Sequence, residues 1–232
     1  MKHIVQFSGG KDSTCMLLMM LEKGMAVDEI IFCDTGKEFP GMYKHIAKVE
    51  RHIGRAITVL KAERSFDYFF AEHVKVKGKN IHRKGYGWAR MWVRWCTRLL
   101  KQDPTNKYLK NQGNYTQYIG IAADEPKRHK NITKNTVHPL FDWGVTEKQA
   151  LQYCYDRGFD WGGLYEHFRR VSCWCCSLQR LSELRTLRKY YPELWRELID
   201  MDSRVEYKFK PDYSVEQLER RFALEDLQQK LF

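Results

Sequence analysis

The sequence predicts an α/β protein, with a parallel sheet sandwiched by helices and a helical C-terminal extension. Two observations predict this fold. Short apolar runs alternate with amphipathic segments in the N-terminal part, as in parallel strands joined by helical crossovers, and leucines recur at helical spacing near the C-terminus. The 232 residues are 43% hydrophobic, enough for a sizeable core, and no apolar run approaches the roughly 18 residues that span a bilayer.

The N-terminal part contains three apolar runs with the length and composition of buried strands. We expect Gly24 to end the first intervening helix and Pro40 to begin the second, because proline favours the first helical turn. The predicted elements are a strand at 3–7, a helix at 13–23, a strand at 29–33, a helix at 40–53 and a strand at 56–60.

The remaining chain is predicted to add one strand and several helices. Pro192 should break the leucine-rich helical segment, and Ser214 with Gln217 forms a capping-box signal that opens a last helix toward Leu231. The predicted elements are a strand at 118–122, a helix at 146–157, interrupted helix over 181–198 and the last helix from 214.

Positive charge is concentrated in one segment. The formal net charge is +11, and residues 75–110 hold seven Lys and four Arg against a single acid, Asp103. The aromatic residues of the same segment include Tyr86, Trp88, Trp92 and Trp95. Basic residues interleaved with aromatics suit a nucleotide or nucleic-acid surface, because cations meet phosphates and rings stack on bases. A solvated basic face with the aromatics packed beneath it is the alternative.

Residues 8–13, Ser-Gly-Gly-Lys-Asp-Ser, lie between the first predicted strand and the first predicted helix. The two glycines let backbone N–H groups approach an anion, and the helix N-terminus adds unpaired N–H donors and a favourable dipole. Lys11 adds a positive charge and the two serines add hydroxyl donors. The pattern predicts a phosphate-binding loop, distinct from the Walker A loop, which has a longer gap before Gly-Lys-Ser/Thr.

Three stretches resemble those of a known family. The loop at 8–13 resembles the PP-loop of the adenine nucleotide alpha-hydrolase-like superfamily, and residues 34–40 resemble the DTG-x-x-FP motif of phosphoadenosine phosphosulfate (PAPS) reductases. Residues 120–128 resemble that family's G-x-R-x-x-E/D-x-x-R element, with Ala122 where the element has arginine. The chain therefore resembles the PAPS reductase-like family, which implies a Rossmann-like fold of the adenine nucleotide alpha-hydrolase type.

The resemblance implies a site for an adenine nucleotide, ATP in preference, with Mg²⁺. The phosphates would be held by Ser8, Gly9, Gly10, Lys11, Asp12 and Ser13. The other nucleotide-binding residues would be Asp34, Gly120, Asp124 and Arg128. The catalytic residues would be Lys11, Asp12 and Asp34. Independently, an aspartate at the carboxyl end of a parallel strand lies where α/β sheets bind ligands, and a turn-capping role is the alternative for Asp34.

The seven cysteines fall into two groups. Those in apolar stretches, which we expect in the core, are Cys15, Cys33 and Cys154. Cys173 and Cys176 have the C-x-x-C spacing that lets two thiolates reach one metal centre, with Cys175 between them and Cys96 beside the basic segment. Reduced, unligated thiols are the alternative.

The family often carries a cysteine in a C-T-x-x-L-K element and a pair in G-C-W-x-C. Residues 96–101 and 172–176 resemble these elements, with serine in place of the glycine. The ligands that the resemblance implies for a [4Fe–4S] cluster are Cys96, Cys173 and Cys176, with Cys175 as the candidate fourth. Zn²⁺ is the alternative, because four thiolates suit it equally.

The sequence favours a member of the family that uses ATP. Such a member transfers an adenylyl group, releases pyrophosphate and so activates a substrate for iron–sulfur-assisted sulfur transfer. The reductases of the family use a nucleophilic thiol in a C-terminal motif, whereas this chain has no cysteine after Cys176. The SGGKDS loop is typical of members that split ATP between the α- and β-phosphates. The alternatives are a PAPS or adenosine phosphosulfate reductase with an unusual thiol, and a non-catalytic nucleotide- or nucleic-acid-binding module.

We expect a PP-loop nucleotide-binding domain at 1–160, with a basic insertion at about 75–110, and a cysteine-containing helical extension at 161–232 packed on it. The expected partners are an adenine nucleotide, a tRNA or DNA substrate, and a sulfur donor or reductant protein, with no membrane. The sequence begins directly with a strand-like stretch, so we expect no signal peptide and a cytoplasmic protein. The oligomeric state stays open, with a homodimer as one option.

Overall fold

The structure is a computed structural model that describes residues 1–77, 81–130 and 132–229. Gly78 and Lys79 of the predicted basic segment, and the predicted end of the last helix near Leu231, lie outside the described residues.

The chain forms two compact units, which we describe separately. The first unit comprises Met1–Asp34, Glu38–Ala62 and Lys101–Ser172. The second comprises Thr35–Lys37, Glu63–Leu100 and Cys173–Phe232. The domain limits expected from the sequence stay a prediction.

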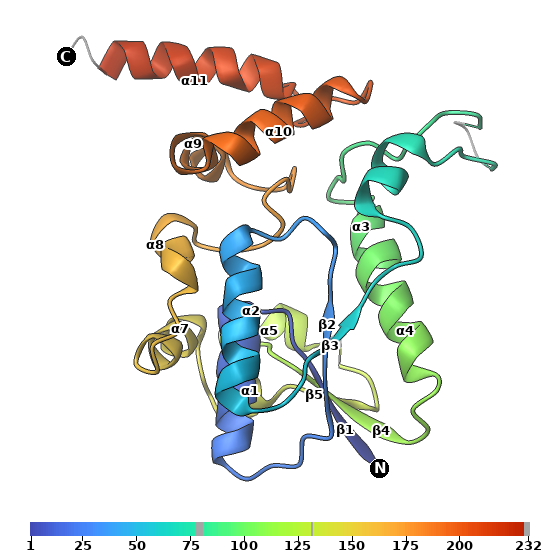
Figure 1. Cartoon of the computed structure of the whole chain (residues 1–232), viewed down its shortest axis with the longest axis vertical. Coiled ribbons are helices and arrows are strands. Elements are labelled where there is room, and N and C mark those ends of the chain that lie inside the picture. The colour runs from blue at the N-terminus through green and yellow to red at the C-terminus, as the bar shows by residue number, and fades with distance from the viewer. Residues whose placement is uncertain (78–80, 131, 230–232) are drawn as a thin grey trace. The chain divides into compact units, whose positions relative to one another are not determined.

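A five-stranded, all-parallel sheet forms the centre of the first unit (Figure 1). Its strands are β1 (Lys2–Gln6), β2 (Glu29–Cys33), β3 (Thr58–Leu60), β4 (Tyr115–Ile119) and β5 (Thr136–Val137), in the order β3-β2-β1-β4-β5. In the central strand, Val5 pairs with Ile30 on one side and with Tyr118 on the other. The strand order reverses between β1 and β4, and parallel sheets bind ligands beyond the carboxyl ends of strands at such a point.

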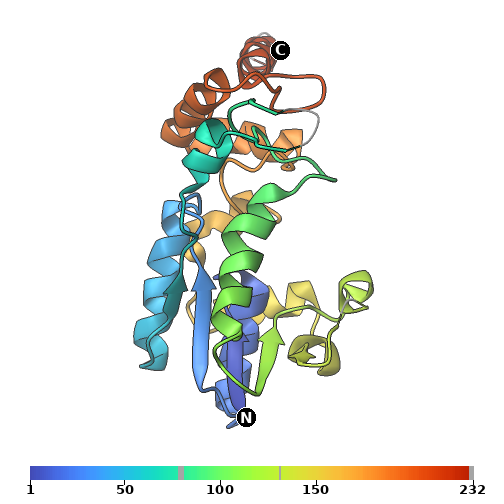
Figure 2. The ribbon, with the colours of Figure 1, turned by 90° about the vertical axis from the view of Figure 1, so that its right-hand side faces the viewer.

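Helices cover both faces of this sheet. They are α1 (Lys11–Glu22), α2 (Pro40–Ile53), α4 (Asp103–Leu109), α5 (Pro126–His129), α6 (Pro139–Asp142), α7 (Glu147–Tyr155) and α8 (Leu164–His167), with a 3-10 turn η3 at Trp161–Gly163. The helices α1 and α2 lie on one face and α4 on the other (Figures 1 and 2). Ile4 and Ile31, both fully buried, pack with Leu109 of α4. The layers confirm the predicted α/β sandwich.

Three strands differ in extent from the prediction, and β1 begins and ends one residue earlier than predicted, at Lys2–Gln6. The strand β4 lies three residues earlier than predicted, because Tyr115 to Ile119 pair with Lys2 to Gln6 of β1. Beyond it the Ile121 N–H donates to the Ile119 carbonyl over 3.0 Å, which turns the chain out of the sheet. The strand β3 covers only the last three residues of the predicted run.

The second unit is mainly helical. Its elements are the π-helical turn η1 (Tyr68–Glu72), α3 (Trp95–Thr97), α9 (Leu181–Tyr190), α10 (Pro192–Ser203) and α11 (Val215–Gln229), while the π-helical turn η2 (Arg98–Gln102) leads back to the first unit. Pro192 separates α9 from α10, as predicted. The Gln217 N–H donates to Ser214 Oγ over 3.2 Å and the Ser214 N–H to Gln217 Oε1 over 2.9 Å, which confirms the predicted capping box.

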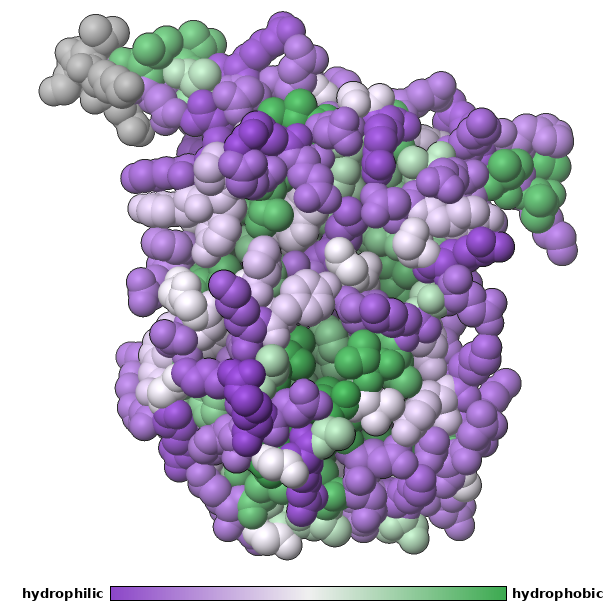
Figure 3. Space-filling view, in the orientation of Figure 1, coloured by the Kyte–Doolittle hydropathy of each residue, from purple (hydrophilic) through white to green (hydrophobic). Residues whose placement is uncertain are grey.

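Hydrophilic side chains cover most of the face seen in Figure 3. None of the described helices combines the length and the apolar character needed to cross a membrane.

Replacing Ile4 with alanine should lower the free energy of unfolding by about 2–5 kcal/mol, because the side chain is fully buried between the sheet and α4. Urea denaturation followed by circular dichroism measures the change. Val59→Ala on β3, where the side chain is 50% exposed, should stay within about 0.5 kcal/mol of the wild type. Equal losses in both variants would contradict the packing of α4 on the sheet.

Candidate functional site

The loop from β1 to α1 adopts a geometry that requires its first glycine. Gly9 has a φ of +77°, in the left-handed region, and a Cβ atom there would lie 2.6 Å from Met42 Sδ. Gly10 is extended and precedes α1, and its carbonyl accepts the first helical hydrogen bond, from the Thr14 N–H, over 3.0 Å. The loop therefore leads from the central strand directly into a helix N-terminus, as the sequence predicts.

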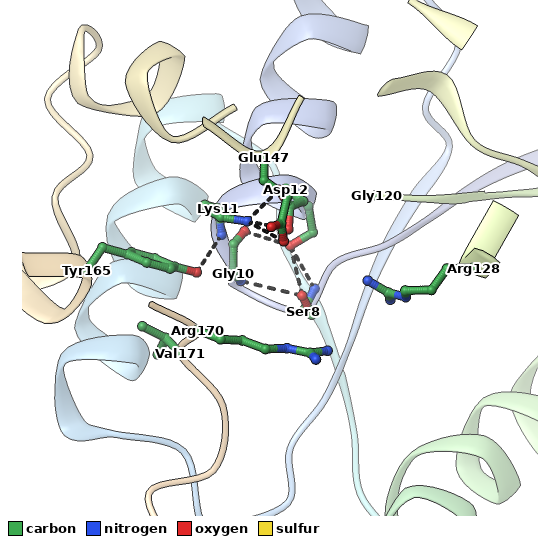
Figure 4. A pocket seen from close by; sticks show the side chains of 11 residues that line it. Ser8, Gly10, Lys11, Asp12, Gly120, Arg128, Glu147, Tyr165, Arg170 and Val171 are labelled. Atoms are coloured by element: carbon green, nitrogen blue, oxygen red, sulfur yellow. Dashed lines mark hydrogen bonds and ion pairs between the residues drawn. The ribbon is translucent and has the colours of Figure 1, made fainter. Parts of the chain in front are cut away.

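The two serines of the loop hold it closed on itself (Figure 4). The Ser8 N–H donates to Ser13 Oγ over 3.1 Å, and the two hydroxyl oxygens lie 3.0 Å apart. Ser13 Oγ also lies 3.0 Å from the Gly10 carbonyl, to which it donates. The serine side chains thus stabilise the loop conformation as well as offering hydroxyl groups.

The turn η3 and the helix α8, late in the first unit, form hydrogen bonds with this loop. The Trp161 indole N–H donates to the Gly9 carbonyl over 2.7 Å, and Tyr165 Oη accepts the Lys11 N–H over 2.9 Å. Trp161 is buried and has a φ of +54°, unusual for a residue with a side chain. Sequence reasoning missed both aromatic residues. The only local signal is the Gly162-Gly163 pair, which permits a tight turn.

A buried histidine extends the support of the loop. The ring of His45 stacks on Trp161 with centroids 4.3 Å apart, and its Nε2 lies 3.0 Å from Thr14 Oγ1. Burial lowers the pKa of His45 to about 3, with a smaller effect in the same direction from Lys48. The imidazole is therefore neutral and acts as a packing group.

Lys11 lies at the centre of a charged group. Its Nζ lies 2.9 Å from Asp12 Oδ1 and 3.1 Å from Glu147 Oε1, and the residue is only 8% exposed. Burial raises the pKa of Asp12, against the effect of Lys11, and the negative charges of Glu147 and Glu125 raise it further. Glu125 in turn pairs with Arg128, whose Nη1 lies 2.7 Å from Glu125 Oε1.

The carboxylates of Asp12, Glu125 and Glu147 fit a divalent cation. One oxygen from each lies within 4.8 Å of the others. Carboxylate oxygens are the ligands that Mg²⁺ prefers. Lys11 pairs with Asp12 and Glu147, and Arg128 pairs with Glu125, so two cations face three carboxylates. The sequence analysis selected neither Glu125 nor Glu147 as a site residue. Glu147 could not be found from a local pattern, because it reaches the loop from the first turn of α7.

Lys11, Asp12 and Glu147 line one cavity at the carboxyl ends of β1 and β4, the place that the sheet order indicates, and Glu125 is not among its lining residues. Its lining residues are Ser8, Gly10, Lys11, Asp12, Ser13, Gly120, Arg128, Glu147, Tyr165, Arg170 and Val171. The side chains of Arg128 and Arg170 point toward the space beside Ser8 (Figure 4). A Cβ atom at Gly120 would lie 2.8 Å from the Ser13 nitrogen, so the end of β4 can approach α1 only as glycine.

Three of the predicted nucleotide-binding residues, Gly9, Asp34 and Asp124, are not among the residues that line the cavity. Asp34 follows β2, accepts a hydrogen bond from Tyr43 Oη over 2.8 Å and lies 3.4 Å from Lys61 Nζ. Asp124 Oδ1 accepts the Glu147 N–H over 3.0 Å, at the start of α7. Asp34 and Asp124 are not among the lining residues of the cavity, and Asp124 instead positions the helix that carries Glu147.

The C-x-x-C residues form a turn in the second unit. The Cys176 N–H donates to the Cys173 carbonyl over 3.1 Å, and Gln179 Nε2 donates to the same carbonyl over 3.2 Å. The Trp174 N–H donates to the Lys37 carbonyl over 3.0 Å. The segment Thr35–Lys37, read from the sequence as part of a nucleotide motif, therefore holds the cysteine turn.

The thiols of this turn influence one another. Burial raises the pKa of Cys175 well above its usual value, and the neighbouring Cys173 and Cys176 raise it further. Cys173 Sγ lies 3.5 Å from Thr35 Oγ1. In the described parts of the chain, no three cysteine sulfurs lie within 4.8 Å of one another. Cys96, from α3, belongs to the same unit.

The remaining cysteines occupy the core of the first unit, as predicted. Cys15, Cys33 and Cys154 are all buried.

Replacing Trp161 with phenylalanine should weaken binding of inorganic pyrophosphate or ATP by roughly 2- to 12-fold, because the ring remains while the donor to Gly9 is lost. Isothermal titration calorimetry measures the affinity, and circular dichroism checks the fold. Trp143→Phe, a tryptophan of the same unit outside the cavity lining, is the matched control. Unchanged affinity in Trp161→Phe would show that this hydrogen bond does not support the loop.

Comparisons with known proteins place the chain in a family. It matches the model of the phosphoadenosine phosphosulfate reductase domain over residues 2–179. It is 28% identical over 215 residues to an uncharacterized protein of Methanocaldococcus jannaschii, covering 83% of this chain and 39% of the relative. It is 31% identical over 148 residues to an uncharacterized nin region protein of Escherichia phage lambda, covering 56% of this chain and 51% of the relative. The chain thus spans 39% and 51% of the length of these curated relatives.

A solved structure shares the fold. The PAPS reductase from Candida auris, in a phosphate complex, superposes with a TM-score of 0.51 at 15% identity, over 75% of this chain and 82% of that chain. The family match covers most of the chain and includes the loop, the cavity and the cysteine turn. The chain belongs to the phosphoadenosine phosphosulfate reductase domain family, within the PP-loop superfamily.

Proposed function

We propose that this chain binds an adenine nucleotide, ATP in preference, and splits it between the α- and β-phosphates to activate an acceptor for sulfur transfer. One observation carries the proposal: the phosphate loop and three carboxylates that fit a divalent cation lie together at Lys11. Carboxylates beside the loop would repel a bare phosphate. A divalent cation held by those oxygens removes the repulsion and itself binds phosphate oxygens. The site therefore suits a metal–polyphosphate such as Mg²⁺–ATP.

The residues of the site suit release of pyrophosphate. A nucleophilic atom of the acceptor attacks the α-phosphorus, the bond to the bridging oxygen breaks, and its electron pair leaves with pyrophosphate, while the proton of the attacking group passes to water. Lys11 and the N-terminus of α1 stabilise the charge that develops on pyrophosphate, and Arg128 and Arg170 add two cations. A Mg²⁺ ion on Asp12, Glu125 and Glu147 would supply further charge neutralisation.

The second unit supplies thiols for the sulfur chemistry in this proposal. Cys96, Cys173 and Cys176, with Cys175 as a fourth, would hold a [4Fe–4S] cluster, and Zn²⁺ is the other metal that thiolates suit. The turn supports this role because it places three cysteines in four consecutive residues with backbone geometry already fixed. A cluster would supply sulfur binding or electron transfer. A tRNA or DNA acceptor and a sulfur-donor or reductant protein complete the proposal.

The family match supports a second candidate, sulfonucleotide reduction. It requires a thiol that attacks sulfate sulfur. The carboxylate group beside the loop favours the ATP reaction, because a cation site is of most use to a polyphosphate substrate.

Incubation with ATP and Mg²⁺ should release AMP and pyrophosphate, in the presence of an acceptor or slowly to water. Lys11→Met should lower this turnover by about 100-fold, because the variant loses the cation at the leaving pyrophosphate. Coupled pyrophosphate detection and chromatography of the nucleotides measure both products.

Lys44→Met, an exposed lysine of the same unit outside this cavity, serves as the control and should retain full turnover. Release of sulfite from PAPS with thioredoxin, and none of AMP from ATP, would contradict the proposal and establish the reductase. Binding of ATP without turnover with any acceptor would establish the non-catalytic module.

An anaerobic preparation should be brown, with absorption near roughly 400 nm. The colour should disappear in Cys96→Ala and in Cys173→Ala, because each removes a ligand, and remain in Cys15→Ala, a core cysteine of the first unit. Absorption spectra with iron and sulfide analysis measure the cluster. A colourless protein that binds one zinc ion would contradict the iron–sulfur assignment.

A further inference from the structure

A tight turn before α3 exposes a large aromatic side chain. The Arg90 N–H donates to the Val93 carbonyl over 3.2 Å and the Val93 N–H to the Arg90 carbonyl over 3.0 Å, which closes the turn. At its tip, Trp92 is 91% exposed and Met91 69% exposed. An indole left in water forfeits the stabilisation of a large apolar surface, so such a ring indicates a binding surface.

The neighbouring tryptophans show that this exposure is specific to the tip. Trp88 and Trp95 are both buried. The Trp88 indole N–H donates to Asp202 Oδ1 over 2.6 Å, and the Trp95 indole N–H donates to the Gly87 carbonyl over 2.9 Å. Both ends of the turn are therefore anchored within the second unit, and Trp92 is presented on a fixed support. Trp88 and Trp95 therefore pack inside, as a solvated basic face above packed aromatics would require, whereas Trp92 does not.

The segment that contains the turn carries only positive charges in its own sequence. The sequence contains no Asp or Glu between residues 74 and 102. Arg90 and Arg94 flank the exposed ring and are themselves exposed. Neither guanidinium forms an ion pair with another residue of the described chain, whereas Arg83 nearby in sequence is engaged with Glu206 and Tyr207.

We propose that the turn at residues 90–94 binds single-stranded nucleic acid, with an unpaired base stacked on Trp92 and backbone phosphates on Arg90 and Arg94. A ring between two free cations matches the repeat of a nucleotide strand, in which bases and phosphates alternate. A duplex does not fit, because its bases are stacked on one another. The proposal takes its nucleic-acid acceptor from the proposed function, but binding at this turn requires neither ATP nor metal.

The alternative ligand for this turn is a protein partner. The segments that precede and follow residues 78–80 also expose apolar side chains: Val74, Val76 and Ile81. Apolar side chains are visible in Figure 3 at the end of this segment, at the upper right. The absence of acids in residues 74–102 favours a polyanion, because a phosphate backbone offers regular charge complementarity.

The test measures fluorescence anisotropy of labelled oligonucleotides of about 12 nucleotides. Single-stranded DNA, single-stranded RNA and a duplex of the same sequence are titrated with the full chain, with and without ATP and Mg²⁺. We expect both single strands to bind more tightly than the duplex, and the ratio of DNA to RNA affinity identifies the natural strand. Trp92→Ala should weaken binding by at least about fivefold, and Trp92→Phe should restore part of the loss because it keeps a stacking ring.

Charge is tested separately. Arg90→Gln with Arg94→Gln should reduce the slope of log affinity against log salt by about 1.4, the value for two phosphates of a single strand. Tyr190→Ala, an aromatic residue 49% exposed in the same unit, and Arg220→Gln, a surface arginine of α11, are the matched controls and should bind as the wild type does.

Three results would overturn the proposal: no binding of single strands by the wild type, equal affinity in Trp92→Ala, or equal affinity for the duplex. A cross-linked protein that is lost in Trp92→Ala, together with no oligonucleotide binding, would assign the turn to a protein partner. Because oligonucleotide binding is also measured without ATP, the two proposals fail separately. Loss of oligonucleotide binding would leave the release of AMP and pyrophosphate unaffected, and absence of that release would leave the anisotropy unaffected.

Discussion

The candidate site depends on one hydrogen bond between distant parts of the first unit, from the Trp161 indole N–H to the Gly9 carbonyl. A loop that presents N–H groups to an anion directs its carbonyls toward the protein interior, and a buried carbonyl without a donor costs about 1–3 kcal/mol. Trp161 supplies that donor, and Tyr165 accepts the Lys11 N–H from the following helical turn. The left-handed backbone at Trp161 persists because burial of the ring and this bond outweigh its strain.

The same loop conformation determines the position of the Lys11 ammonium group. Lys11 is held between Asp12 and Glu147, so its ammonium group does not face an incoming anion alone. In the proposed function, this arrangement would favour an anion that carries its own cation, because a bare anion would meet the carboxylates of Asp12 and Glu147 beside Lys11. Asp124 contributes by holding the start of the helix that carries Glu147.

The parts of this structure that follow from neighbouring residues could be predicted from sequence. Strand, glycine turn and helix at residues 2–22 are a local pattern, and the caps at Pro40 and Ser214 act within one helical turn. Trp161, Tyr165 and Glu147 could not be predicted, because they reach the loop from more than 130 positions away and no local pattern marks them. Asp34 follows a strand, as the sequence predicts, but the partners of its carboxylate include Tyr43 and Lys61, which the sequence does not indicate.

The cysteine turn contains one buried thiol, Cys175, close to the cation of Lys37. Lys37 is the cation that acts on Cys175, but its ammonium group already pairs with Asp67 at 3.2 Å and Glu197 at 3.1 Å. Burial alone would lower the pKa of Lys37, and these two carboxylates outweigh it and raise the pKa. Burial and the neighbouring thiols outweigh the effect of Lys37 and raise the pKa of Cys175, which disfavours its thiolate. If Cys175 is a ligand in the proposed metal centre, metal binding would release its proton in the same step.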